Sequence, residues 1–333
     1  MKLGLSFILF VVMFLFTSCA QKVRIRALEP AQIDRISQTK KIAVLNFKND
    51  RVTLSHKIEA NLAGFRIKNK KYFTIVSRND LNQVLNEQKF QSSGLTDEKN
   101  SVKVGEIIGA EAIISGNVQS PAKQDSYYYA DRVRCANAKC SELIYYRVRC
   151  MKRVVGLSAE IRVVDVSLGD IIYADTFSRS RVYKHCSDDS HPLPSTSMAA
   201  QNLATSIANQ FTYKLTPHYR EFYVTLLEDP DLDYTSKQEK LLKYSLEYIQ
   251  QARYDKAETL LMQLIDSTNA KSYVAFYDLG VIKEAQGKYE EAKEYYDYAD
   301  NLMIEPVEEI NEAIVRINSL IEKRKRTLKQ LER

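Results

Sequence analysis

Residues 104–118 read VGEIIGAEAIISGNV, and they place a short helix directly before an apolar strand. The helix is expected over residues 102–108 and the strand over residues 112–118. Two earlier apolar runs, KIAVLNF at residues 41–47 and YFTIV at residues 72–76, predict further short strands. Helices are predicted between these strands from apolar residues at helical spacing, which are Leu54, Ile58, Leu62 and Phe65 in the first and, after a cap at Asn79, Leu81, Val84 and Leu85 in the second.

The chain then becomes rich in β-branched residues. These dominate residues 154–166 and 171–182, and the turn signal SLGD at residues 167–170 predicts a β-hairpin between them. A long helix is expected from Ser195, and its apolar side is formed by Met198, Leu203, Ile207 and Phe211. Strands that alternate with helices and then continue as a β meander imply an α/β domain, in which helices flank a mixed sheet.

Several of these segments together resemble the CsgG family, the curli-secretion lipoproteins. The resemblance extends over about residues 40–215 and is carried by residues 41–47, 72–81, 84–88, 104–118, 163–165 and 169–171. The wider family includes LpoB-like activators of peptidoglycan synthases. The resemblance implies a periplasmic α/β domain on an outer-membrane lipoprotein, and it brings no catalytic residues.

The N-terminus has the features of an export and lipidation signal. Lys2 is followed by an apolar run of about 14 residues, which suits a signal peptide better than a membrane span. Residues 1–18 are therefore expected to be removed, and Cys19 to become the acylated, palmitate-bearing first residue. Simple cleavage and an uncleaved anchor remain the alternatives. No Asp follows Cys19, which favours the outer membrane and a chain facing the periplasm. The polar residues 19–39 are interpreted as a tether.

Four further cysteines remain after Cys19, an even number that suggests two disulfides in an exported protein. Paired residues of an antiparallel hairpin have a constant sum, so a turn centred near Leu168 places Cys150 opposite Cys186. A four-residue loop at residues 136–139 likewise places Cys135 opposite Cys140. We therefore predict the disulfides Cys135–Cys140 and Cys150–Cys186. A zinc site that combines these cysteines with His185 and His191 is less favoured, because no C-x-x-C pair occurs.

The first hairpin raises the question whether the chain forms a membrane pore, as the resemblance would allow. A membrane strand needs about 9–11 residues with one apolar face. Residues 127–155 contain many charges, and Asp131 interrupts the apolar side of the first arm. We therefore expect a disulfide-stapled hairpin extension of the domain that is soluble.

The C-terminal third has a helical repeat pattern. Tetratricopeptide-like spacing places small residues such as Gly280 and Ala292 where two antiparallel helices meet. Charge also changes sign here, because residues 1–228 are rich in Lys and Arg and residues 229–312 in Asp and Glu. The expected domains are therefore residues 40–228 and an all-α domain at residues 236–333. By resemblance, the concave face of the repeats would bind a protein partner through Tyr277, Val281 and Glu284. A purely structural or dimerising role for the repeats is the alternative.

The sequence shows no motif that indicates an enzyme. It contains no Gly-rich phosphate loop, H-E-x-x-H or G-x-S-x-G, so we expect no catalytic residues, cofactor or metal site. Export disfavours nucleic-acid binding. The first hypothesis is a non-enzymatic outer-membrane lipoprotein that acts as a scaffold or assembly factor for protein partners of an envelope machine, with a homo-oligomer as one form it can take. The alternatives are a CsgG-like secretion channel component and an LpoB-like activator of a peptidoglycan synthase, with an undetected enzyme third.

Overall fold

The computed structural model describes residues 20–67, 69–77 and 98–332, and it divides into two compact units. The repeat unit combines the residues up to Pro30 with His218–Lys329, and the sheet unit comprises Ala31–Pro217 with Gln330–Arg333. The predicted signal peptide, Cys19 and the helix expected after Asn79 lie outside the described residues.

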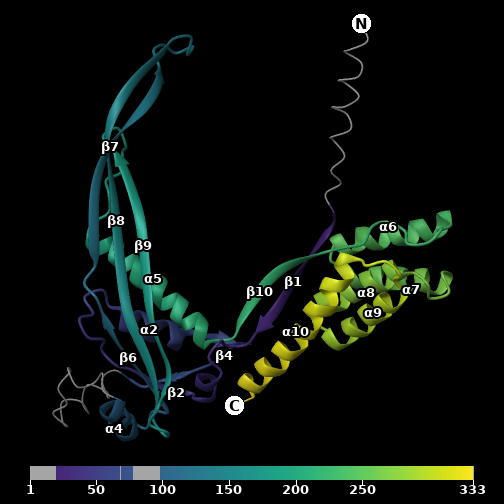
Figure 1. Ribbon diagram of the computed structural model, residues 1–333, viewed down its shortest axis with the longest axis horizontal. Coiled ribbons are helices and arrows are strands. Elements are labelled where there is room, and N and C mark those ends of the chain that lie inside the picture. Colours follow the sequence, from purple (N-terminus) through teal and green to yellow (C-terminus); the bar gives the residue numbers. More distant parts are fainter. Residues whose placement is uncertain (1–19, 68, 78–97, 333) are drawn as a thin grey trace. The chain divides into compact units, whose positions relative to one another are not determined.

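The sheet unit is built on a mixed six-stranded sheet in the order β5-β2-β6-β8-β7, with β9 paired to the other edge of β8 (Figure 1). Strand β2 runs parallel to β5 and β6, whereas β8 is antiparallel to β6, β7 and β9. The strands are β2 (Lys41–Val44), β5 (Thr74–Ile75), β6 (Ala112–Val118), β7 (Ala122–Cys135), β8 (Leu143–Asp165) and β9 (Ile171–Cys186). The mixed sheet predicted from the sequence is confirmed.

Helices α2 (Leu54–Gly64) and α5 (Thr196–Leu215) pack together, and their apolar residues join the strands in one buried core. The predicted start of α5 is confirmed, because the Ser195 hydroxyl accepts a hydrogen bond of 3.1 Å from the Met198 N–H. Met198 itself is exposed, so its expected place on the apolar side was wrong. Short elements complete the unit, namely η1 (Arg35–Gln38), β3 (Arg66–Ile67), β4 (Lys70–Lys71) and α4 (Glu98–Ile108).

Strands β7 and β8 continue past the helices as a long hairpin, which we call the arm (Figure 1). The arm is closed by both predicted disulfides, Cys135–Cys140 at the tip and Cys150–Cys186 at the end of β9. Cys150 lies opposite Cys186, as the constant-sum argument predicted. At the tip the predicted register was wrong, because Cys135 lies opposite Leu143, and the disulfide to Cys140 forms inside a longer loop.

The repeat unit contains five helices within the described residues, and α6 packs with α7 and α8 with α9. Their bounds are α6 (Ser236–Gln250), α7 (Tyr254–Ser267), α8 (Tyr273–Ala285), α9 (Tyr289–Leu302) and α10 (Glu308–Leu331). A Cβ on Gly280 would lie 2.6 Å from the Tyr296 ring, so only glycine allows α8 and α9 to approach this closely. All-α packing of this region was predicted.

The same unit contains a two-stranded antiparallel ribbon that the sequence interpretation missed. Strand β1 (Lys22–Glu29) pairs along its whole length with β10 (His218–Thr225). Residues 22–29 were expected to lie in a tether, and residues 218–228 in the preceding domain. The structure instead places both with the helices, because Val23, Ile25 and Ala27 are buried in their core.

None of the helices in the described part of the chain combines the length and the apolar character that a bilayer-spanning helix needs.

Candidate functional site

The arm presents one face of large exposed side chains. Successive residues of a strand point to opposite faces, so the register of β7 and β8 gathers every second residue on one side. Tyr127, Tyr129 and Tyr145 are 62%, 64% and 77% exposed. We call this side the tyrosine face, and it consists of Tyr127, Tyr129, Asp131 and Val133 from β7 and of Leu143, Tyr145, Arg147 and Arg149 from β8.

Two arginines lie against the tyrosine rings. The Arg149 guanidinium carbon is 4.5 Å from the centroid of the Tyr127 ring, and that of Arg147 is 5.3 Å from the centroid of Tyr129. Arg147 also lies 3.4 Å from the Asp131 carboxylate, which contributes little because both side chains are well exposed. These cation–π contacts hold the rings across the strands and leave them open to a partner.

The opposite side of the arm is partly covered. Val148 and the Cys150–Cys186 disulfide form a small buried cluster there, and Arg132 reaches Asp188 at 3.2 Å. Closer to the body of the sheet, Arg153 donates two hydrogen bonds of 2.8 and 2.9 Å to Asp125. These bonds lower the pKa of the Asp125 carboxyl to about 2, so the pair stays charged at any physiological pH. The disulfide and the ion pairs therefore stabilise one side of the arm, and the other side is exposed.

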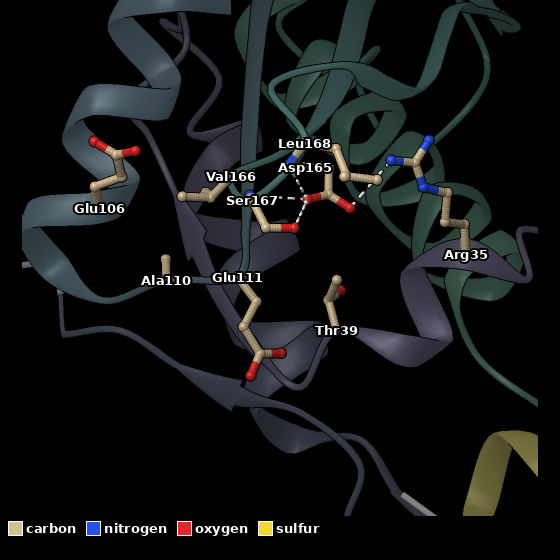
Figure 2. A pocket seen from close by; sticks show the side chains of 9 residues that line it. All are labelled: Arg35, Thr39, Glu106, Ala110, Glu111, Asp165, Val166, Ser167 and Leu168. Carbon is tan, nitrogen blue, oxygen red and sulfur yellow. Dashed lines mark hydrogen bonds and ion pairs between the residues drawn. The ribbon is translucent and has the colours of Figure 1, made fainter.

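A polar cavity of about 490 Å³ lies at the other end of the sheet, beside η1 and α4 (Figure 2). Asp165 accepts hydrogen bonds from the N–H groups of Ser167 and Leu168, at 2.9 and 3.0 Å, and from Arg35 at 3.2 Å. Burial raises the pKa of Asp165, but these bonds outweigh it and lower the pKa overall. The lining residues are Arg35, Thr39, Glu106, Ala110, Glu111, Asp165, Val166, Ser167 and Leu168.

The acidic side chains that line this cavity hold the surrounding loops in place through hydrogen bonds. Asp165 caps the turn after β8, and Arg35 joins that turn to Asp170 with a bond of 2.7 Å. Glu111 accepts a hydrogen bond of 2.5 Å from the N–H of Lys40, just before β2. Glu106 lies on α4, apart from Asp165 (Figure 2). The arrangement stabilises the loops at this end of the sheet. The side chains that line the cavity do not converge on a common point, as a general acid and a general base acting on one substrate atom would.

The three residues predicted to bind a partner are buried, so that prediction does not hold. Tyr277, Val281 and Glu284 are at most 1% exposed. The Tyr277 hydroxyl donates a hydrogen bond of 2.8 Å to the Thr225 carbonyl of β10. Glu284 accepts bonds from the Tyr296 hydroxyl, at 2.6 Å, and from Arg316 of α10. The ribbon and α10 therefore cover the face that was expected to be open.

The described cysteines and histidines are not arranged as a metal site. All four described cysteines are oxidised to disulfides, which removes the thiolates that the zinc alternative requires. His185 Nδ1 instead lies 2.8 Å from the His191 carbonyl. Within residues 20–67, 69–77 and 98–332, no three His, Cys, Asp or Glu side chains are arranged to hold a metal ion. Cys19 lies outside these ranges, and its lipidation stays a prediction.

The tyrosine face was not predicted from the sequence, although its residues lie in the predicted hairpin. The predicted tip register differs from the observed one by three residues, and an odd shift moves one strand's side chains to the other face. Pairing Cys135 with Cys140 would place Tyr129 opposite Tyr146 and Tyr127 opposite Val148. The observed pairing puts them with Tyr145 and the arginines.

Comparisons with known proteins give one family-model match. The family model described as "Curli production assembly/transport component CsgG" matches residues 26–124. No curated protein matches the chain.

Three solved structures are similar to part of this chain. The LpoB C-terminal domain from Salmonella enterica is 13% identical, with a TM-score of 0.26, over 45% of this chain and 95% of that one. Lipoprotein GNA1162 from Neisseria meningitidis is 15% identical, with a TM-score of 0.28, over 52% and 98%. The PelC dodecamer from Paraburkholderia phytofirmans is 12% identical, with a TM-score of 0.21, over 60% and 99%.

The resemblance to the CsgG family stated from the sequence is confirmed by the family-model match at residues 26–124.

Proposed function

We propose that this chain is a non-enzymatic outer-membrane lipoprotein that faces the periplasm and acts as a scaffold or assembly factor of an envelope machine. Cys19 anchors it, and the tyrosine face of the arm binds a protein partner. The observation that carries the proposal is this face, an open array of aromatic and arginine side chains on a disulfide-braced hairpin. The description of the matching family, an assembly/transport component, supports a role of this class.

The chemistry of the face suits a protein partner. Tyr and Arg are enriched at the centres of protein interfaces, where they supply large contact areas and directional hydrogen bonds. The face is mixed rather than purely apolar, because Asp131, Arg147 and Arg149 lie among its aromatic rings. Because the disulfides and cation–π contacts already order the arm, less conformational entropy is lost when a partner binds.

The test is site-specific photo-cross-linking in intact cells. A photoreactive amino acid replaces Tyr145 on the arm or, as the matched control, Tyr298 on α9, which is also well exposed. We expect a discrete cross-linked protein from position 145 that disappears when Tyr129→Ser and Arg147→Ser are added. The same product from both positions, or one that survives the two substitutions, would contradict the proposal. A ring-shaped oligomer extracted only by detergent would instead favour the secretion channel.

A further inference from the structure

The ribbon of β1 and β10 has one face that is largely exposed within the part of the chain that the structure describes. Its inner face is packed on the helices, with Val23 and Ile25 of β1 buried at 4% and 1% exposure. The outer face, which we call the basic face, alternates with it along both strands. It consists of Lys22, Arg24, Arg26 and Leu28 from β1 and of Tyr219, Glu221, Tyr223 and Thr225 from β10.

The basic face combines cations with exposed aromatic rings. Arg24 lies opposite Tyr223, and Arg26 stacks over the Tyr219 ring at 3.9 Å. The Arg24 and Arg26 side chains are 66% and 61% exposed. Glu221, the single carboxylate of this face, lies 3.9 and 4.0 Å from the two arginines, so it leaves them largely solvated. Three cations thus face one anion.

The ribbon also begins close to the proposed lipid anchor. Gln21 is already held in place, because its N–H donates a hydrogen bond of 2.6 Å to Glu228 and its carbonyl accepts one of 2.9 Å from the Leu226 N–H. Only Ala20 separates Gln21 from Cys19 in sequence. Three extended residues span roughly 10 Å, so an acylated Cys19 would keep Lys22 near the lipid headgroups.

We propose that the basic face of the ribbon lies on an anionic phospholipid surface. The inference rests on the lipid anchor of the proposed function. Basic residues next to an acyl chain strengthen membrane attachment by attraction to anionic headgroups. Tyrosine rings prefer the interface between headgroups and acyl chains. The basic face supplies both groups, and the chain distance from Cys19 selects a membrane over a protein as the occupant.

The experiment uses residues 20–333, which lack the acyl group, so that only the basic face is tested. Flotation with vesicles containing phosphatidylglycerol measures the partition coefficient, and pure phosphatidylcholine vesicles serve as the neutral surface. We expect salt-sensitive binding to the anionic vesicles only. Changing Lys22, Arg24 and Arg26 together to Gln should lower the partition coefficient by roughly fivefold for each cation removed.

A matched variant controls for net charge. Lys237, Lys240 and Lys243 are exposed on α6, and changing all three to Gln removes the same charge from the same unit. This control should bind almost as the parent does. Equal losses in the two triple variants, or equal binding to neutral vesicles, would overturn the proposal. Circular dichroism verifies that both variants fold.

A fluorescent reporter gives a second readout that does not depend on the charge changes. The chain has no Trp, so Tyr223→Trp places a single indole on the basic face, and Tyr244→Trp places one on exposed α6. Anionic vesicles should shift the emission of the first variant to shorter wavelength and leave the second unchanged. Identical responses, or none, would contradict the proposal. Such a failure leaves the Cys19 anchor and the tyrosine face untouched, because neither is used here.

Discussion

Asp278 on α8 is a carboxyl group enclosed completely by the repeat unit. The Leu227 N–H donates a hydrogen bond of 3.1 Å to one of its oxygens, and the other oxygen has no hydrogen-bond partner within the described residues. Burial raises the pKa of Asp278 well above its usual value, and Glu228 and Asp231 raise it further by their charge. The residue therefore retains its proton in the folded protein at pH values where the unfolded chain has lost it.

This difference predicts an unusual pH dependence of stability. Below about pH 4 the carboxyl is protonated in both states. Above that pH the unfolded chain ionises first, so folding stability falls by about 1.4 kcal/mol per pH unit until the pH passes the folded pKa. Asp278→Asn needs no proton and should be more stable than the parent at neutral pH. Urea unfolding at pH 5, 6 and 7 measures the effect. A stability difference between parent and variant that stays constant over this range would contradict the assignment.

At the scale of elements, the arm depends on the long disulfide more than on the short one. Cys150–Cys186 closes a loop of 36 residues, whereas Cys135–Cys140 closes one of 5. In the loop-entropy model these are worth about 4 and about 2 kcal/mol. We predict that replacing Cys150 and Cys186 together by Ser lowers the free energy of unfolding of the sheet unit about twice as much as replacing Cys135 and Cys140. Denaturant titrations of the two double variants test the ranking, and a larger loss at the tip would refute it.

The two hairpins of the sheet unit show which strand pairings local sequence patterns can predict. The hairpin of β8 and β9 could be predicted because the SLGD turn is short and Gly169 adopts the left-handed conformation it requires. The strand register at the tip of the arm could not be predicted, because the loop between Cys135 and Leu143 has no short turn that fixes the pairing. A shift of the register by an odd number of residues changes which side chains share the exposed face. The aromatic and arginine residues of the arm could therefore be read from the sequence, but which of them share one face could not be predicted.

Long-range pairing accounts for the other misses. Strand β1 alternates cations with apolar residues, a period of two that indicates a strand, but its average polarity resembles that of a tether. Its partner β10 lies almost 200 residues later, beyond any local pattern. Tyr277 and Glu284 were expected to be open for a similar reason: the helix and strand that cover them cannot be recognised from the repeat motif alone.

At the scale of the whole molecule, the proposed anchor decides where both units act. Cys19→Ala should abolish incorporation of labelled palmitate and release the protein from the outer-membrane fraction, because several acyl chains bind a bilayer far more firmly than a basic surface does. Fractionation of cells that express the parent or the variant gives the answer. Cys135→Ala with Cys140→Ala is the matched control, and it should keep both label and location. Unchanged labelling after Cys19→Ala would disprove the anchor.

The pairing of Glu29 with His218 makes the sheet unit an insertion within the repeat unit. The two residues face each other at the end of the ribbon, so the whole intervening segment enters and leaves the repeat unit at one place. During synthesis from the N-terminus, β1 emerges first and must wait for β10 before its apolar side is covered, which makes completion of the repeat unit a late, nonlocal folding event. Joining Glu29 to His218 through a two-residue turn would remove the whole intervening segment and leave the ribbon and the helices as one continuous chain.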